Sequence, residues 1–195
     1  MSPHLAWYVA RASGILAWLL LSAAVIWGLL LSTRLLQRRP SPRWLLDLHR
    51  FLGGLAVIFV GVHILGLVAD NYLHFGVADV LVPFASQWRT SAVALGVVSI
   101  WLLVAVEITS LLMRRLPRRL WHRVHLASYG TFWFVTLHAV LAGSDSNNAL
   151  FRLTMYGIIV VVVFLTVIRV MQPHQPKVLP AASLRRPVGQ PSTTR

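Results

Sequence analysis

The sequence predicts an all-α fold, a polytopic membrane helix bundle with about five transmembrane helices. Of its 195 residues, 57% are hydrophobic and only 12% are charged, which is too few charges for the surface of a soluble domain. Long apolar runs recur along the chain, and arginines flank them. Because a helix needs about 20 mostly apolar residues to cross the bilayer core, these runs indicate membrane-spanning helices.

Each of the five runs has the length and flanking charges of a spanning helix. The first is uncharged from position 12 up to Arg34. The last has 16 residues between Arg152 and Arg169, so we expect both arginine side chains to reach the membrane interfaces. The five predicted helices cover residues 12–33, 51–69, 90–113, 124–142 and 149–170.

Lys and Arg are distributed unequally over the predicted connections. Fifteen of the eighteen fall around the first and third connections and after the last helix, on one side of the membrane. The remaining three are Arg11, Arg89 and Arg152. Because cytoplasmic loops are enriched in Lys and Arg, we expect the N-terminus outside and the C-terminus in the cytoplasm.

The helices are predicted to form one domain, residues 1–170. Residues 171–195 are rich in Pro, Ser and Arg, and we expect a disordered basic cytoplasmic tail. The semi-apolar connection 70–88 is expected to lie on the membrane surface and to include a short helix. The outer connections contain four polar residues: Asp70, His74, Asp79 and Asp145. We expect them either to be solvated loop residues or to form a site for a metal or an electron acceptor.

The composition excludes several classes of function. The chain contains no cysteine, which excludes disulfides, thiolate-bound metal and covalently attached haem of the C-x-x-C-H type. Its net charge of +13 does not indicate nucleic-acid binding, because the arginines lie beside apolar runs and not on one soluble face.

The stretch LHRFLGGLAVIFVGVHIL, residues 48–65, carries two histidines in and beside a predicted membrane helix. On a helix, His49 and His63 lie about 21 Å apart along the axis and within roughly 40° around it. One helix face therefore presents an imidazole near each side of the membrane.

The fourth predicted helix repeats this arrangement with His125 and His138, in HRVHLASYGTFWFVTLHAVLAGSD. His63 and His138 each precede an aspartate by seven residues, so their depths agree. Since both helices run in the same direction, we expect His49 to face His125 and His63 to face His138. On an ideal helix His125 and His138 point about 140° apart, which suggests an irregular helix start at His125 or changed winding near Gly130.

Two facing imidazoles at one depth suit haem iron, which takes one axial nitrogen on each side of the porphyrin. The alternative for a single histidine is a hydrogen bond to a neighbouring helix, but matched depth and spacing on two helices favour haem. We therefore predict two bis-histidine haems across the bilayer, with these axial ligands of the iron: His49, His63, His125 and His138.

Other charged residues have two interpretations each. Arg50 and Arg123 are candidates for contacting the propionates of an inner haem, and Arg11 or Arg89 those of an outer one. Topology and contact with lipid headgroups are the favoured explanation for any single arginine. Glu107 is the one acid within a predicted span, and we expect it to accept a histidine N–H or to pair with an arginine.

The two quoted stretches resemble the ferric reductase-like transmembrane domain, a superfamily that includes ferric reductases, NADPH oxidases and the membrane subunit of a bacterial methionine sulfoxide reductase system. The resemblance covers roughly residues 12–170. It implies b-type haem held by His49, His63, His125 and His138, and electron transfer from the cytoplasm outward. It also implies an integral protein of the bacterial inner (plasma) membrane, because this chain is similar to the short bacterial subunits.

Eukaryotic members of that superfamily carry fused flavin and nicotinamide domains, whereas this sequence contains no G-x-G-x-x-G or similar phosphate-binding loop. We therefore expect a separate cytoplasmic flavoprotein or reductase as electron donor and an acceptor on the outer side. The alternative function is a proton-coupled transporter or channel that uses buried histidines. Against it, the predicted helices lack Pro-broken segments and contain few acids.

Overall fold

The computed structural model describes residues 4–33, 43–70 and 75–172. These residues form six helices and no strand: α1 (Leu5–Thr33), α2 (Arg43–Val68), α3 (Val77–Leu81), α4 (Thr90–Leu111), α5 (Arg118–Ala142) and α6 (Ala149–Met171). All except α3 are long and apolar enough to cross a membrane. The predicted all-α fold with five spanning helices is confirmed, while the predicted disordered tail lies outside the described residues from position 173 onward.

Three helices begin earlier than their apolar runs, and the first of them, α1, starts at Leu5 instead of position 12. Helix α2 starts at Arg43 instead of position 51, and α5 starts at Arg118 instead of position 124. Intrahelical hydrogen bonds do not require apolar side chains, so a helix can continue into the polar interface while its arginines reach water. As a result, His49 and His125 lie inside regular helices and not in loops.

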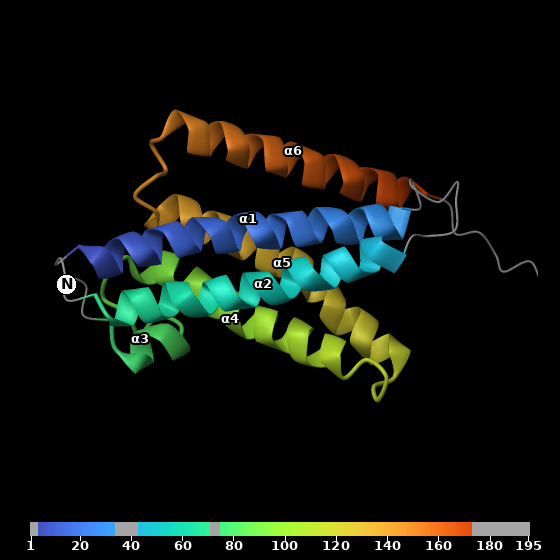
Figure 1. Cartoon of the computed structure of the whole chain (residues 1–195), viewed down its shortest axis with the longest axis horizontal. Coiled ribbons are helices and arrows are strands. Elements are labelled where there is room, and N and C mark those ends of the chain that lie inside the picture. Colours follow the sequence, from blue (N-terminus) through green and yellow to red (C-terminus); the bar gives the residue numbers. More distant parts are fainter. Residues whose placement is uncertain (1–3, 34–42, 71–74, 173–195) are drawn as a thin grey trace, which may run out of the picture.

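The long helices form two hairpins. Helix α1 packs along α2, and α4 packs along α5, while α6 lies against α1 (Figure 1). The two helices that carry the paired histidines, α2 and α5, therefore belong to different hairpins. The fold places the histidine pairs between these hairpins.

Buried side chains join the two hairpins. Leu29 of α1 and Phe132 of α5 are almost fully buried and pack with Val162 of α6. Farther along, the indole Nε1 of Trp18 donates to the hydroxyl of Thr136 at 3.1 Å, and this contact is also buried. The bond fixes the register of α1 on α5, because an unpaired indole N–H would be costly in an apolar core.

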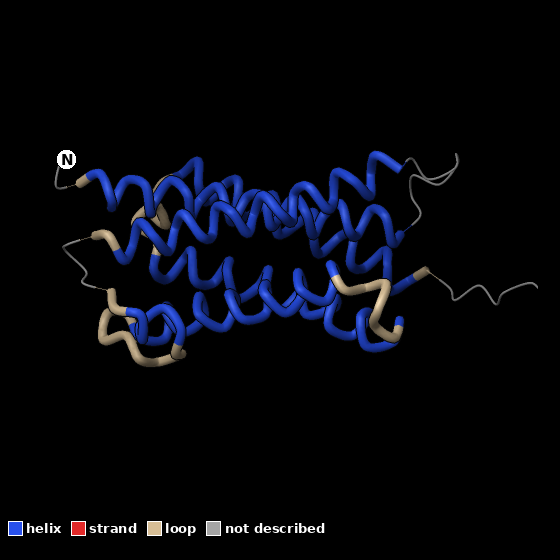
Figure 2. The backbone as a smooth tube through the Cα atoms, turned by 60° about the horizontal axis from the view of Figure 1, so that its bottom comes forward, coloured by secondary structure: helices blue, strands red, loops and turns tan. Residues whose placement is uncertain are grey.

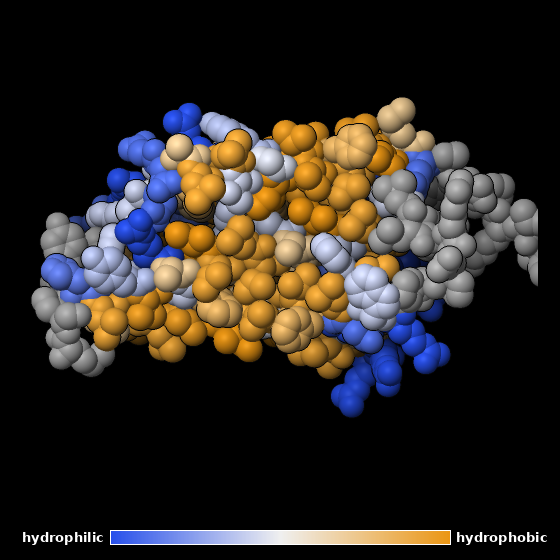
Figure 3. Space-filling model, turned by 45° about the horizontal axis from the view of Figure 1, so that its top comes forward, coloured by the Kyte–Doolittle hydropathy of each residue, from blue (hydrophilic) through white to orange (hydrophobic). Residues whose placement is uncertain are grey.

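The long helices run lengthwise beside one another, with the loops gathered at the two ends (Figure 2). On the face shown in Figure 3, apolar side chains form a broad central band and hydrophilic side chains lie toward the ends, as lipid contact requires. The connection between α2 and α4 contains the expected short helix, α3, at the same end as the start of α1 (Figure 1). Its location on the membrane surface stays a prediction.

Candidate functional site

The structure brings the four histidines together as the two expected pairs. The ring centroids of His63 and His138 are 6.5 Å apart, with the ring planes at 81°. Those of His49 and His125 are 5.9 Å apart, at 72°. Each pair thus joins one ring of α2 to one ring of α5.

Three of these rings are held by backbone carbonyls of the neighbouring helix. His63 Nδ1 lies 2.7 Å from the carbonyl oxygen of Ala10, and His49 Nδ1 lies 3.0 Å from that of Ala24, both on α1. His138 Nδ1 lies 2.7 Å from the carbonyl oxygen of Ala92 on α4. A carbonyl only accepts, so Nδ1 carries the proton in each neutral ring and Nε2 keeps its lone pair free.

His125 has different contacts. Its Nδ1 lies 3.4 Å from the hydroxyl of Ser110, not from a carbonyl. Its ring stacks on the indole of Trp121, with centroids 5.0 Å apart and planes at 22°. The Trp121 Nε1 is buried without a hydrogen-bond partner among the described residues.

The predicted irregularity of the fourth spanning helix is wrong. Helix α5 is a continuous α-helix from Arg118 to Ala142, with neither a late start at His125 nor a break at Gly130. Instead, α5 is inclined to α2 in Figure 1. Two inclined helices do not oppose one fixed stripe along their length, so ligands about 140° apart on an ideal helix can both approach the partner.

Glycines allow the supporting helices to approach the rings. A Cβ added to Gly14 would lie 2.8 Å from His63 Nδ1, and one added to Gly96 would lie 2.9 Å from His138 Nδ1. A Cβ on Gly28 would lie 3.3 Å from His49 Cε1. Real Cβ contacts essentially never fall below 3.0 Å, so a side chain at Gly14 or Gly96 would displace the ring that the helix supports.

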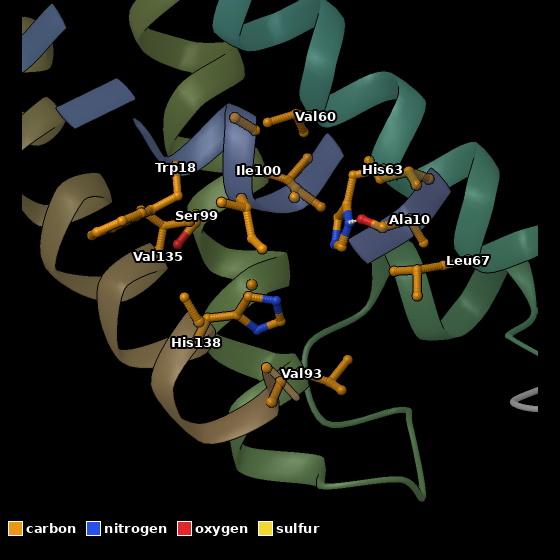
Figure 4. Close-up of a pocket in the computed structure, with 18 of the residues that line it drawn as sticks. Ala10, Trp18, Val60, His63, Leu67, Val93, Ser99, Ile100, Val135 and His138 are labelled. Atoms are coloured by element: carbon orange, nitrogen blue, oxygen red, sulfur yellow. Dashed lines mark hydrogen bonds between the residues drawn. The ribbon is translucent and has the colours of Figure 1, made fainter. Parts of the chain in front are cut away.

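A cavity of about 360 Å³ contains the His63–His138 pair. The two rings project into it from α2 and α5, and the Ala10 carbonyl contacts His63 from the side (Figure 4). Most of its lining is apolar, including Val93, Ile100 and Val135. An apolar cavity with a few convergent nitrogen donors is typical of a cofactor site.

Two arginines, Arg11 and Arg89, also line this cavity. Arg11 forms a bidentate ion pair with Asp145, in which Nε donates to Oδ2 at 2.6 Å and the terminal nitrogen donates to Oδ1. Arg89 donates to the carbonyl of Leu141 at the end of α5. Both cations are therefore placed beside the cavity by protein acceptors.

Glu107 does not show either expected contact: among the described residues, its carboxylate is bonded to neither a histidine nor an arginine. It instead points at α2, where a Cβ on Gly53 would lie 2.8 Å from Oε1. Gly53 follows His49 by one helical turn, and Glu107 precedes Ser110 by one turn. The acid therefore lies between α2 and α4, near the His49–His125 pair.

The polar residues of the outer connections do not form a metal site in the described part of the chain, which contains no group of three or more suitable ligands. Asp145 is bound to Arg11, and the Asp79 carboxylate accepts the Gly76 N–H at 2.8 Å. His74 lies outside the described residues.

The geometry of both pairs fits a six-coordinate haem iron. With metal–nitrogen bonds of about 2.0 Å on each side, two axial imidazoles have centroids about 6 Å apart, close to the two observed separations. Three of the rings keep Nε2 available, and the bonds at their Nδ1 atoms are of the kind that orient metal-bound histidines. The buried Trp121 N–H, which has no partner within the described part of the chain, also fits a site that brings an acceptor of its own, such as a propionate.

Sequence reasoning missed the residues that support the rings. A signal was present, because Gly14 and Gly28 are separated by 14 positions, the same spacing as His49 and His63. Gly96 and Ser110 are also separated by 14 positions. The acceptor carbonyls left no such signal, since every residue has one.

The comparisons agree with this geometry. A family model described as "Ferric reductase like transmembrane component" matches residues 13–137. The match includes His49, His63 and His125 and ends one residue before His138. No curated protein and no solved structure matches the chain.

Proposed function

The chain belongs to the ferric reductase-like transmembrane component family, and from this premise we propose that it carries electrons across a membrane through two bis-histidine b-type haems. Family membership and five spanning helices support an integral membrane protein with a role in transmembrane electron transfer.

One observation carries it: four histidines form two ring pairs between separate helix hairpins, at separations that suit an iron between each pair. The axial ligands are His49 with His125 and His63 with His138. A haem held in this way supplies the uptake and release of single electrons. A structural role for the histidines would not require matched pairs at two depths.

The chain provides the conditions for such transfer. His49 and His63 lie about 21 Å apart along α2, so the two pairs divide the membrane thickness into shorter steps. The carbonyls of Ala10, Ala24 and Ala92 hold the rings in one orientation. The lining around the His63–His138 pair is mostly apolar, and apolar surroundings limit the reorganisation that accompanies a change of charge.

The donor is a separate flavoprotein or reductase at the cytoplasmic face. A nicotinamide cofactor delivers a hydride, whereas haem accepts single electrons, so a flavin is needed between them. The arginines at the ends of α4 and α5 lie on the side that the positive-inside rule assigns to the cytoplasm, and they offer a docking surface for an acidic partner. This orientation places the His49–His125 pair nearer the donor.

The His63–His138 pair then lies near the outer face of a bacterial inner membrane, where electrons pass to an acceptor on that side. Arg11 and Arg89 line the same cavity, and their positive charge favours haem propionates or an anionic acceptor there.

The test is electron transfer across sealed proteoliposomes. Ferricyanide trapped inside should be reduced when dithionite is added outside, because neither ion crosses the lipid and the protein provides the path. Empty vesicles and vesicles with the His63→Ala variant are the controls. Reduction no faster in wild-type vesicles than in empty ones would contradict the proposal.

A further inference from the structure

Three of the four histidines are held in the same way. The supporting helix provides a carbonyl to Nδ1 and, four residues later, a glycine against the ring. Four residues are about one helical turn, so both groups lie on one face of that helix. The three sets are Ala10 and Gly14 for His63, Ala24 and Gly28 for His49, and Ala92 and Gly96 for His138.

The fourth position contains a serine. Ser110 follows Gly96 by 14 residues on α4, as Gly28 follows Gly14 on α1. It occupies the place opposite His125 that glycine occupies opposite the other three rings. The serine Cβ keeps the ring away from the α4 backbone, and its hydroxyl lies 3.4 Å from His125 Nδ1, longer than any of the three carbonyl contacts.

The indole of Trp121 stacks on the His125 ring, with ring centroids 5.0 Å apart. The ring therefore contacts an indole and a hydroxyl, and the hydroxyl provides the contact to its Nδ1. None of the other three rings has a stacked indole among the described aromatic contacts.

We infer that Ser110 is a positioning residue that tunes the His49–His125 centre, giving it a higher midpoint potential than a carbonyl-supported ligand would give. This inference rests on the proposed function. An imidazole N–H that donates a strong hydrogen bond makes the ring a better electron donor to the metal and favours the ferric state. The long contact to a hydroxyl does so less than a carbonyl at 2.7 Å.

Two substitutions of Ser110 have opposite expected effects. Ser110→Ala removes the acceptor but keeps the Cβ that blocks the backbone, so the midpoint potential of the His49–His125 centre should rise. Ser110→Gly removes the Cβ and lets the His125 ring approach α4, as in the other three sets. This variant should lower the midpoint potential. Ser110→Thr keeps the hydroxyl and should leave the potential near that of the wild type.

The experiment is a potentiometric titration of the purified, haem-loaded full chain in nanodiscs, followed by visible and low-temperature EPR spectra. Repeating each titration in a His63→Ala background isolates the His49–His125 centre. Thr109→Val is the matched control, because the Thr109 hydroxyl donates to the Ala105 and Val106 carbonyls within its own helix and contacts no histidine among the described bonds.

The inference is supported if the midpoint potential rises in Ser110→Ala and falls in Ser110→Gly, and if only the His49–His125 centre is affected. Shifts of the same sign, shifts of the His63–His138 centre, or unchanged potentials in all Ser110 variants would overturn it while leaving the proposed function intact. A wild-type chain that purifies without haem would instead overturn the proposed function, and the role of Ser110 with it.

Discussion

The histidine rings can keep their positions only if the glycines that contact them carry no Cβ. One such close approach involves Gly96, whose added Cβ would lie 2.9 Å from two atoms of the His138 ring. We expect Gly96→Ala to displace this ring and to remove the haem of the His63–His138 pair. The measurement is the haem content per chain, with the size-exclusion profile to establish that the variant is folded.

Gly157→Ala on α6 is the matched control, since nothing lies within 4 Å of a Cβ added there. It should keep the haem content of the wild type. Equal haem content in both variants would show that the glycine at position 96 is not needed for the ring.

The residue scale also shows where sequence reasoning succeeds and where it stops. The pairing of His63 with His138 follows from depth, because both precede an aspartate by seven residues, and depth is fixed by the helix rise. The acceptor for His138 is the backbone oxygen of Ala92, which no side-chain pattern announces. The role of Ser110 requires knowing which face of α4 meets α5, and apolar side chains on every face of that helix conceal it.

At the scale of helices, one ion pair connects the start of α1 to the connection between α5 and α6. The Arg11 side chain is 38% exposed and that of Asp145 is 14% exposed, so the pair is partly shielded from water and bidentate. We expect Arg11→Gln to lower the free energy of unfolding by about 1 kcal/mol. A double-mutant cycle with Asp145→Asn measures the coupling in detergent by thermal unfolding.

Arg50→Gln provides the comparison for that pair. Arg50 and Asp47 are 3.7 Å apart, with side chains 57% and 69% exposed, and such contacts contribute little. The substitution should leave the melting temperature unchanged. A coupling near zero for Arg11 with Asp145 would mean that the pair does not hold the helices together.

Helix boundaries were the weakest part of the prediction from sequence, for a physical reason. Apolar runs mark the part of a helix that lipid covers, whereas α2 and α5 continue to Arg43 and Arg118 through polar residues. The number and order of the spanning helices were predictable, because lipid leaves few alternatives to a helix of this length. The inclination of α5 could not be predicted from the sequence, since it depends on how the helices pack against one another.

For the whole molecule, the unequal distribution of arginines leads to a kinetic prediction. If an acidic flavoprotein docks on the arginine-rich end, haem reduction by the donor should slow roughly tenfold as ionic strength rises from low to high values. Stopped-flow absorbance of the purified chain mixed with reduced flavoprotein measures this rate.

Replacing four arginines in the α4–α5 connection and the first turn of α5 by glutamine should reduce that salt dependence: Arg114, Arg115, Arg118 and Arg119. Arg152 lies at the start of α6, on the predicted outer side. The Arg152→Gln variant should therefore keep the salt dependence of the wild type. Rapid oxidation of NADPH by the purified chain without any flavin or partner would argue against a separate donor.

Whether the four histidines hold two haems can be measured as the haem stoichiometry of the purified chain and of its four single His→Ala variants. The account predicts two haems per wild-type chain, with the visible and EPR spectra of low-spin bis-histidine haem. It predicts that His63→Ala and His138→Ala lose the same haem, and that His49→Ala and His125→Ala lose the other. Full haem content and unchanged spectra in all four variants would contradict the account.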